Sequence, residues 1–414
     1  MQYLERALDG VLPGMLAHLP AICIQGPRAV GKTSTALRYA KTSWLLDAPG
    51  QQSLLEAQPS RLLADTRPVL IDEWQRLPEV FDLVRREVDR EYAPGSFLLT
   101  GSALIKDSSG THTGAGRVTT LRMHPMSLFE RGVHEVQVNL GKLLMNPQEK
   151  VSGATTWQWG DYAEAICASG FPRITTLPAP YRSKQLRAYL QAIVDRDAPE
   201  AGYNLRSPGR LQAWMRAYAA ASSTTTGYGE ILKAATPGEA DKPAKNTALA
   251  YRDFLTRIWI LDPVPAWDLT ANPITRLAKS PKHQLADPAL AASLLDLDAE
   301  ALRDDPVMGP RLFEALAVLT LRVAGQVHGL RAYHLRTQNG DHEIDLLLRG
   351  AGKRTLAFEV KLKTDITSDD CRHLLWLRDK LDTQLRSCAV ISAGAEAYTR
   401  RDGIHVIPLA LLGA

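Results

Sequence analysis

The sequence predicts an α/β protein in three parts: a domain built on a mainly parallel sheet, a helical module, and a second α/β domain. Three observations lead to this prediction. Short apolar runs at 21–25, 68–71 and 96–99 alternate with helical segments, which favours parallel strands covered by helices on both faces. The pattern then becomes helical over 181–261, and after residue 281 an amphipathic helix precedes three strands. We place the parts at 1–200, 201–272 and 273–414.

The first apolar run ends at a glycine-rich loop. The motif G-x-x-x-x-G-K-[ST] is satisfied by Gly26, Pro27, Arg28, Ala29, Val30, Gly31, Lys32 and Thr33, with Ser34 next. In such a loop the glycines let the backbone wrap a phosphate, and the helix N-terminus favours its negative charge. We expect Lys32 to contact the β- and γ-phosphates of ATP and Thr33 to reach Mg²⁺. The alternative is a structural turn.

Polar residues also follow the second and third apolar runs. Asp72 suits Mg²⁺ binding and Glu73 suits water activation, whereas a solvated acidic pair is the alternative. At the end of the third run, Ser102 is expected to sense the γ-phosphate or orient the water, unless it is an ordinary turn hydroxyl. Arg117 follows a glycine-rich stretch at 106–116. It is a candidate arginine finger on a neighbour's nucleotide, which implies a homo-oligomer, or else a solvated arginine.

Several motifs in order resemble a known family. The segments at 26–34, 70–78, 98–102 and 115–118 together resemble prokaryotic AAA+-type ATPases with an uncharacterised C-terminal region, and the segments at 169–172, 194–197 and 358–361 continue the resemblance. It implies ATP hydrolysis by an AAA+-type domain. Ser169 and Arg173 stand where the family usually has a glycine and an acidic residue.

The helical module contains two short helical segments, at 227–234 and 246–255. The second carries Asn246, Thr247 and Arg252, with Lys245 just before it. Such a pair resembles a winged helix-turn-helix, whose second helix would lie in a DNA groove. DNA is therefore an expected partner. The alternative is a module that only packs against its neighbours.

A set of charged residues marks the C-terminal part. The segments at 342–348 and 358–361 predict two adjacent strands, with Glu359 and Lys361 on one face. With Glu314 on the preceding helix, the set resembles the core of restriction-endonuclease-like nucleases. There Asp345 and Glu359 would hold a divalent metal, Lys361 would position water and Glu314 would complete the shell. Oxygen ligands favour Mg²⁺ or Mn²⁺. The alternative is a solvated strand edge with an ion pair.

Composition sets the remaining expectations. The formal net charge is only +4, so any surface that binds nucleic acid must be local. Candidates to hold a phosphate backbone are Arg331, His334 and Arg336, or they form a solvated face. Four scattered cysteines and the lack of a long apolar run predict a cytoplasmic protein with no membrane partner. The expected function is ATP-controlled action on DNA, including nuclease activity; the alternative is a nucleotide-driven switch or scaffold.

Overall fold

The computed structural model describes residues 3–102, 116–203, 208–236, 245–267, 279–337, 340–352 and 354–414. They form two compact units. Unit 1 comprises Met1–Pro125 with Arg257–Trp259, and unit 2 comprises Met126–Thr256 with Ile260–Ala414. The three predicted boundaries remain predictions, because this division separates only the part that contains the glycine loop from the rest.

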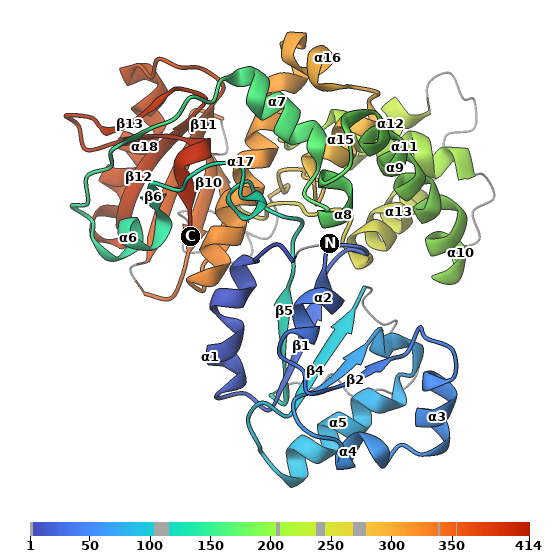
Figure 1. Cartoon of the computed structure of the whole chain (residues 1–414). Helices are drawn as coiled ribbons and strands as arrows, with labels where there is room; N and C mark the ends of the chain where they lie inside the picture. Colours follow the sequence, from blue (N-terminus) through green and yellow to red (C-terminus); the bar gives the residue numbers. More distant parts are fainter. Residues whose placement is uncertain are drawn as a thin grey trace. The chain divides into compact units, whose positions relative to one another are not determined.

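Unit 1 is built on a five-stranded parallel sheet in the order β2-β3-β4-β1-β5 (Figure 1). This confirms the parallel α/β arrangement expected for the N-terminal part. The strands are β1 (Ala21–Gln25), β2 (Thr42–Leu45), β3 (Val69–Asp72), β4 (Phe97–Gly101) and β5 (Val118–Arg122). The α-helices are α1 (Leu12–Leu16), α2 (Lys32–Leu37), α3 (Gln51–Ala57), α4 (Arg61–Ala64) and α5 (Glu79–Arg90), and 3-10 helices cover Ala7–Gly10 and Trp74–Arg76.

Burial explains why unit 1 adopts this sheet. Every residue of β1, β3 and β4 is buried, as expected for central parallel strands covered on both faces. Helix α5 places Val80, Phe81 and Val84 in one core with Ile71 and Leu99 of the sheet. The apolar side chains of these strands therefore fix the sheet, and the polar residues that follow each strand meet at its carboxyl edge.

Unit 2 contains a mixed eight-stranded sheet in the order β7-β13-β14-β12-β11-β10-β9-β8 (Figure 1). Strands β10 and β11 are neighbours, as expected, and they run antiparallel, whereas β11, β12 and β14 run parallel. The strands are β7 (Gly153–Ala154), β8 (Ala266–Trp267), β9 (Arg331–Arg336), β10 (Glu343–Arg349), β11 (Thr355–Lys361), β12 (Leu385–Ser392), β13 (Glu396–Thr399) and β14 (His405–Pro408). A separate small sheet pairs β6 (Val138–Asn139) with β15 (Leu412–Gly413).

Two long helices cover opposite faces of this sheet. Helix α18 (Ser368–Leu381) shares a core with Leu347, Ala357 and Val390. In α17 (Met308–Val327), Gly325 packs so closely on Leu348 that an added Cβ would lie 3.0 Å from its side chain. Because neighbouring residues of a strand point to opposite faces, α17 and α18 lie on opposite sides.

The other helices of unit 2 are mostly short. They are α6 (Leu140–Met145), α7 (Trp159–Ala168), α8 (Pro172–Thr175), α9 (Ala179–Ala192), α10 (Ala198–Glu200), α11 (Pro208–Ala220), α12 (Tyr228–Ala235), α13 (Lys245–Arg257), α15 (Pro288–Leu294) and α16 (Ala299–Asp304). The predicted helix pair is present as α12 and α13, and a π-helix covers Ile193–Asp197. Within the described ranges, none of the helices has both the length and the apolar character needed to span a bilayer.

Candidate functional site

The glycine-rich loop joins β1 to α2, as the motif predicts. Gly31 has a φ of 105°, a left-handed conformation that glycine adopts without strain, and α2 begins at the next residue. A Cβ at Gly26 would lie 2.2 Å from the carbonyl oxygen of Met123. Both motif glycines are therefore required by the backbone of the loop.

Lys32 folds its side chain back into this loop. Its Nζ donates hydrogen bonds to the carbonyl oxygens of Gly26 at 3.0 Å and Pro27 at 2.8 Å, and the residue is only 4% exposed. Burial lowers the pKa of Lys32 to about 8, although the nearby carboxylates of Glu73 and Asp72 act in the opposite direction. The ammonium is thus held at the loop by neutral acceptors that phosphate oxygens can replace.

The structure brings Thr33 and Asp72 together. The Thr33 hydroxyl donates to Asp72 Oδ1 at 2.7 Å, and the hydroxyl of Thr100 donates to the same oxygen. Thr100 lies directly opposite Asp72 in the parallel pairing of β3 with β4. Burial raises the pKa of Asp72, while the two hydroxyl groups oppose that rise. The predicted Mg²⁺ ligands are therefore neighbours, and Thr100 is an additional contact that the motifs did not reveal.

Glu73 directly follows β3, and two side chains hold its carboxylate. Ser102 Oγ donates to Glu73 Oε1 at 2.8 Å, and the Gln75 amide donates to Glu73 Oε2. The backbone of Glu73 has a φ of 54°, an uncommon left-handed conformation for a residue other than glycine. Ser102 thus lies beside Glu73 and contacts its carboxylate, and Gln75 is a further partner. The expected role of Ser102 toward the γ-phosphate or the water stays a prediction.

Arg117 lies elsewhere in unit 1. Its guanidinium pairs with Asp89 of α5 at 2.8 Å. The adjacent Val118 pairs with Ala21 at the start of β1, whereas the glycine loop follows Gln25 at the other end of the strand. Within one chain, Arg117 is therefore at the opposite end of the sheet from the loop. The stretch that precedes it, 103–115, lies outside the described residues.

An N-terminal segment that no motif indicated braces the loop. The buried Arg6 guanidinium donates to the carbonyl oxygens of Val30 at 2.8 Å and His124 at 2.7 Å. Tyr3 and Thr35 of α2 form a hydroxyl–hydroxyl hydrogen bond at 2.8 Å. These contacts fix both the loop and the start of the following helix.

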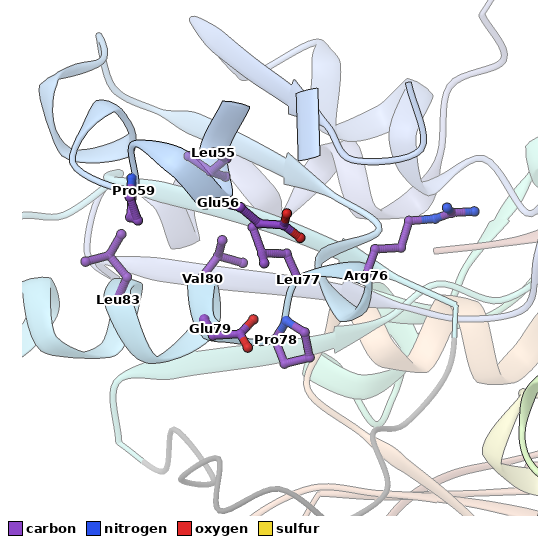
Figure 2. Close-up of a pocket in the computed structure, with 9 residues that line it drawn as sticks. All are labelled: Leu55, Glu56, Pro59, Arg76, Leu77, Pro78, Glu79, Val80 and Leu83. Atoms are coloured by element: carbon purple, nitrogen blue, oxygen red, sulfur yellow. The ribbon is translucent and has the colours of Figure 1, made fainter. Parts of the chain in front are cut away.

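Unit 1 also contains a pocket of about 440 Å³ that is separate from the glycine loop (Figure 2). Its lining comes from α3, the segment between α3 and α4, α5, and the segment between Glu73 and α5. The lining residues are Leu55, Glu56, Pro59, Arg76, Leu77, Pro78, Glu79, Val80 and Leu83. Figure 2 shows the Arg76 guanidinium directed away from the apolar side chains. None of the predicted nucleotide-site residues lines this pocket.

The charged set predicted in the C-terminal part converges in unit 2 around a lysine that the motifs did not indicate. Lys282 Nζ lies 2.9 Å from both Glu314 Oε1 and Asp345 Oδ1. Lys361 Nζ pairs with Glu359 Oε2 at 2.8 Å, so Glu359 and Lys361 do share a face. Glu314, Asp345, Glu359 and Lys361 therefore come together, and Lys282 lies among them.

The charged groups of this cluster change one another's pKa values. Burial alone would raise the pKa of Asp345, but Lys282 and Lys361 outweigh it and lower that pKa to about 2. For Glu314, burial prevails over the attraction of Lys282 and raises the pKa to about 8. Asp345 is thus the anionic partner of Lys282, whereas burial favours a proton on Glu314.

Among the residues expected to hold a phosphate backbone, the two arginines are exposed and the histidine is buried. Arg331 and Arg336 are exposed at the two ends of β9, while His334 is buried and its Nε2 is hydrogen-bonded to the carbonyl of Ser280 at 3.1 Å. In the helical module, Arg252 of α13 pairs with Asp253 at 2.8 Å. The side chains of Lys245 and Asn246 lie outside the described residues.

The motif around Ser169 is a buried structural centre. Asp287 accepts hydrogen bonds from the Ser169 hydroxyl at 2.6 Å and the Gly170 N–H at 2.7 Å, and it also accepts the N–H of Ala289 at 3.0 Å. Arg173, four residues after Ser169, is exposed. This segment therefore joins the C-terminal end of α7 to the start of α15.

Comparison with known proteins supports the assignment of unit 1. Residues 18–131 match the model of an AAA domain, which indicates ATP binding and hydrolysis with Mg²⁺. Residues 160–301 and 310–412 match two domains of unknown function, DUF8612 and DUF4143. Lys282 lies in the first of these two regions, and its partners Glu314 and Asp345 lie in the second.

Two curated proteins resemble most of the chain. They are an uncharacterized protein of Mycobacterium tuberculosis (strain ATCC 25618 / H37Rv) and one of Mycobacterium bovis (strain ATCC BAA-935 / AF2122/97). Each is 26% identical over 403 residues, which covers 95% of this chain and 81% of the relative. The similarity therefore extends through both units.

Proposed function

We propose that unit 1 hydrolyses ATP at the edge of its sheet formed by the glycine loop and the ends of β3 and β4. The hydrogen bond from Thr33 to Asp72 carries this proposal, because it brings the loop and the acidic strand end to one point. Lys32 would balance the charge of the β- and γ-phosphates. Thr33 and Asp72 would hold Mg²⁺, which neutralises phosphate charge as it develops.

Glu73 would act as the general base for the attacking water. Its two carboxylate oxygens are held by Ser102 and Gln75, so its orientation is set by neighbouring side chains. Glu73→Gln is expected to bind ATP but lose turnover, because an amide cannot take the proton of water. Ser102→Ala retains the Glu73 carboxylate and removes only one of the hydrogen bonds that orient it, so it should lower kcat more than it raises KM. Hydrolysis at the wild-type rate by Glu73→Gln would refute this role.

We further propose that Arg117 completes the site of a neighbouring subunit in a homo-oligomer. Its place at the opposite end of the sheet from its own loop supports action in trans. A mixture of Arg117→Ala with Lys32→Ala should regain turnover, because one type of mixed interface pairs an intact loop with an intact arginine. No recovery despite measured subunit mixing would refute the role in trans.

For unit 2 we propose binding of DNA under the control of ATP. Support comes from the helix pair α12 and α13, which resembles a winged helix-turn-helix, and from exposed arginines at both ends of β9. Binding of branched, duplex and single-stranded DNA should be measured with and without ATP. Arg331→Ala combined with Arg336→Ala should weaken it, and weaken its dependence on salt, because phosphate contacts release counterions.

The second candidate is a nucleotide-driven switch or assembly scaffold whose unit 2 binds a protein partner. The ion pairs of Lys282 favour binding roles over DNA cleavage, which would need a divalent metal at Asp345 and Glu359. An assay with Mg²⁺ and Mn²⁺ on the same DNA forms separates the possibilities. Cleavage would restore the nuclease proposal, whereas the absence of both cleavage and binding would favour the switch.

A further inference from the structure

The ammonium of Lys282 lies at the centre of the acidic cluster in unit 2. Its Nζ is 2.9 Å from Glu314 Oε1, 2.9 Å from Asp345 Oδ1 and 3.3 Å from Glu343 Oε1. The side chain is only 1% exposed. An ammonium has three N–H donors, and here three carboxyl groups surround it. The carboxyl oxygens of Glu314 on α17 and of Glu343 and Asp345 on β10 are therefore already engaged by a cation that belongs to the chain.

The backbone of Lys282 is fixed as firmly as its side chain. Lys282 and Val264 exchange two backbone hydrogen bonds, each 2.9 Å long. The N–H of the next residue, His283, donates to the carbonyl of Thr224 at 2.8 Å. The lysine side chain therefore enters the cluster from an anchored backbone position.

The other oxygens of the predicted metal set offer little to an incoming ion. Asp345 Oδ2 accepts the N–H of Val360 at 2.9 Å, and Glu359 Oε2 is paired with Lys361. Glu359 Oε1 is buried without a hydrogen-bond partner, so it is an oxygen that is open to a ligand. Mg²⁺ requires about six oxygen ligands, of which water supplies several. In the described part of the chain, no group of three or more His, Cys, Asp or Glu residues could hold a metal ion.

The residues present therefore do not fit a divalent metal. An ion bound by Asp345 Oδ1 would compete with the Lys282 ammonium for the same oxygen, and the two positive charges would repel each other at short range in a buried site. We propose that Lys282 takes the place of a divalent metal in unit 2, so that the cluster binds neither Mg²⁺ nor Mn²⁺ and does not support metal-dependent cleavage. This inference rests on the cluster alone and not on the ATPase proposal.

The test is to remove the ammonium and ask whether a metal site appears. All variants carry Asp72→Asn to remove the carboxylate of the nucleotide site, and binding of MnCl₂ is measured by electron paramagnetic resonance without nucleotide. The protein with Lys282 should bind no Mn²⁺ at the cluster. Lys282→Ala should bind Mn²⁺, and at about 100 times its dissociation constant Mn²⁺ should raise the melting temperature by several degrees. Adding Asp345→Asn should abolish both effects.

The matched control is Lys279→Ala, which removes a lysine of the same segment whose ammonium donates to the carbonyl of Arg336. It should behave like the protein with Lys282 intact. Mn²⁺ bound by that intact protein and lost with Asp345→Asn would overturn the proposal, and this result does not depend on whether Lys282→Ala folds. A folded Lys282→Ala that binds no Mn²⁺ would also overturn it. Loss of ATP hydrolysis in other variants bears only on unit 1.

Discussion

The buried ammonium of Lys32 makes ATP binding depend on pH in a range where most lysines stay charged. Its pKa in the free protein is about 8 because of burial. A bound triphosphate adds negative charge and raises this pKa, so binding takes up a proton whenever the free lysine is neutral. ATP affinity should therefore approach its full value about one pH unit or more below this pKa, and should fall as the pH rises through it.

The size of this effect follows from the charged fraction of Lys32. With a pKa of about 8, about three quarters of the free protein carries the ammonium at pH 7.5 and about one tenth at pH 9. The affinity should then fall by roughly an order of magnitude, or about 1 kcal/mol, between these values. The phosphates of ATP are ionised over this whole pH range, since their highest pKa is about 6. Cys23 does not interfere, because burial raises its pKa to about 12.

Isothermal titration calorimetry with a non-hydrolysable ATP analogue measures both quantities, if each pH is repeated in two buffers of different ionisation enthalpy. Glu73→Gln should move the inflection to lower pH, because the Glu73 carboxylate raises the pKa of Lys32. Lys32→Arg is the control, since a guanidinium stays charged and its affinity, whatever its value, should not vary with pH here. A constant affinity with no proton uptake in the wild-type protein would refute the reasoning.

Three further predictions concern residues that support the two units. Gly26→Ala should abolish ATP binding, because its Cβ would collide with the backbone of Met123, as equilibrium binding would show. Arg6→Met should weaken ATP binding and lower stability by about 3 kcal/mol, since it removes the charged hydrogen bond to Val30 and another backbone contact; thermal melting measures this. Asp287→Asn should destabilise unit 2 by about 1–3 kcal/mol without changing ATP affinity. The reason is that both carboxylate oxygens accept hydrogen bonds, so the NH₂ group of asparagine would face a hydrogen-bond donor.

Each of these predictions has an outcome that contradicts it. Gly10→Ala is the control for the loop, because an added Cβ there has open space, so equal loss in both variants would argue against the collision. Arg6→Lys keeps the charge but not the two-pronged geometry and should recover only part of the stability. Normal melting of Arg6→Met or Asp287→Asn would show that these buried contacts are dispensable.

Much of unit 1 could be predicted from the sequence because its signals are local. The loop motif, the strand before it and the acidic strand end led to the contact between Thr33 and Asp72, which the structure contains. Thr100 and Gln75 were missed, since their roles follow from strand register and from the turn after β3. Arg6 could not be found, because its partners Val30 and His124 lie 24 and 118 residues away.

Unit 2 shows the same limit more clearly. The pair of Glu359 and Lys361 is two residues apart on one strand, and alternation alone placed both on one face. Lys282 is 32 residues from Glu314 and 63 from Asp345, and it lies in an irregular segment with no periodic pattern. Only the folded chain brings it to the cluster. A motif that lists acids in order therefore predicts where they gather but not which cation they gather around.

The pairing of distant strands in unit 2 has a consequence for synthesis on the ribosome. Strand β6 pairs with β15, so Val138 cannot form its strand pairing until Leu412 has been synthesised. In the same way, β7 pairs with the later strand β13. The five strands of unit 1, by contrast, all lie between Ala21 and Arg122. Unit 1 can therefore assemble its sheet while later residues are still being translated, whereas the early segments of unit 2 stay unpaired for most of translation. Slow elongation would prolong that exposure.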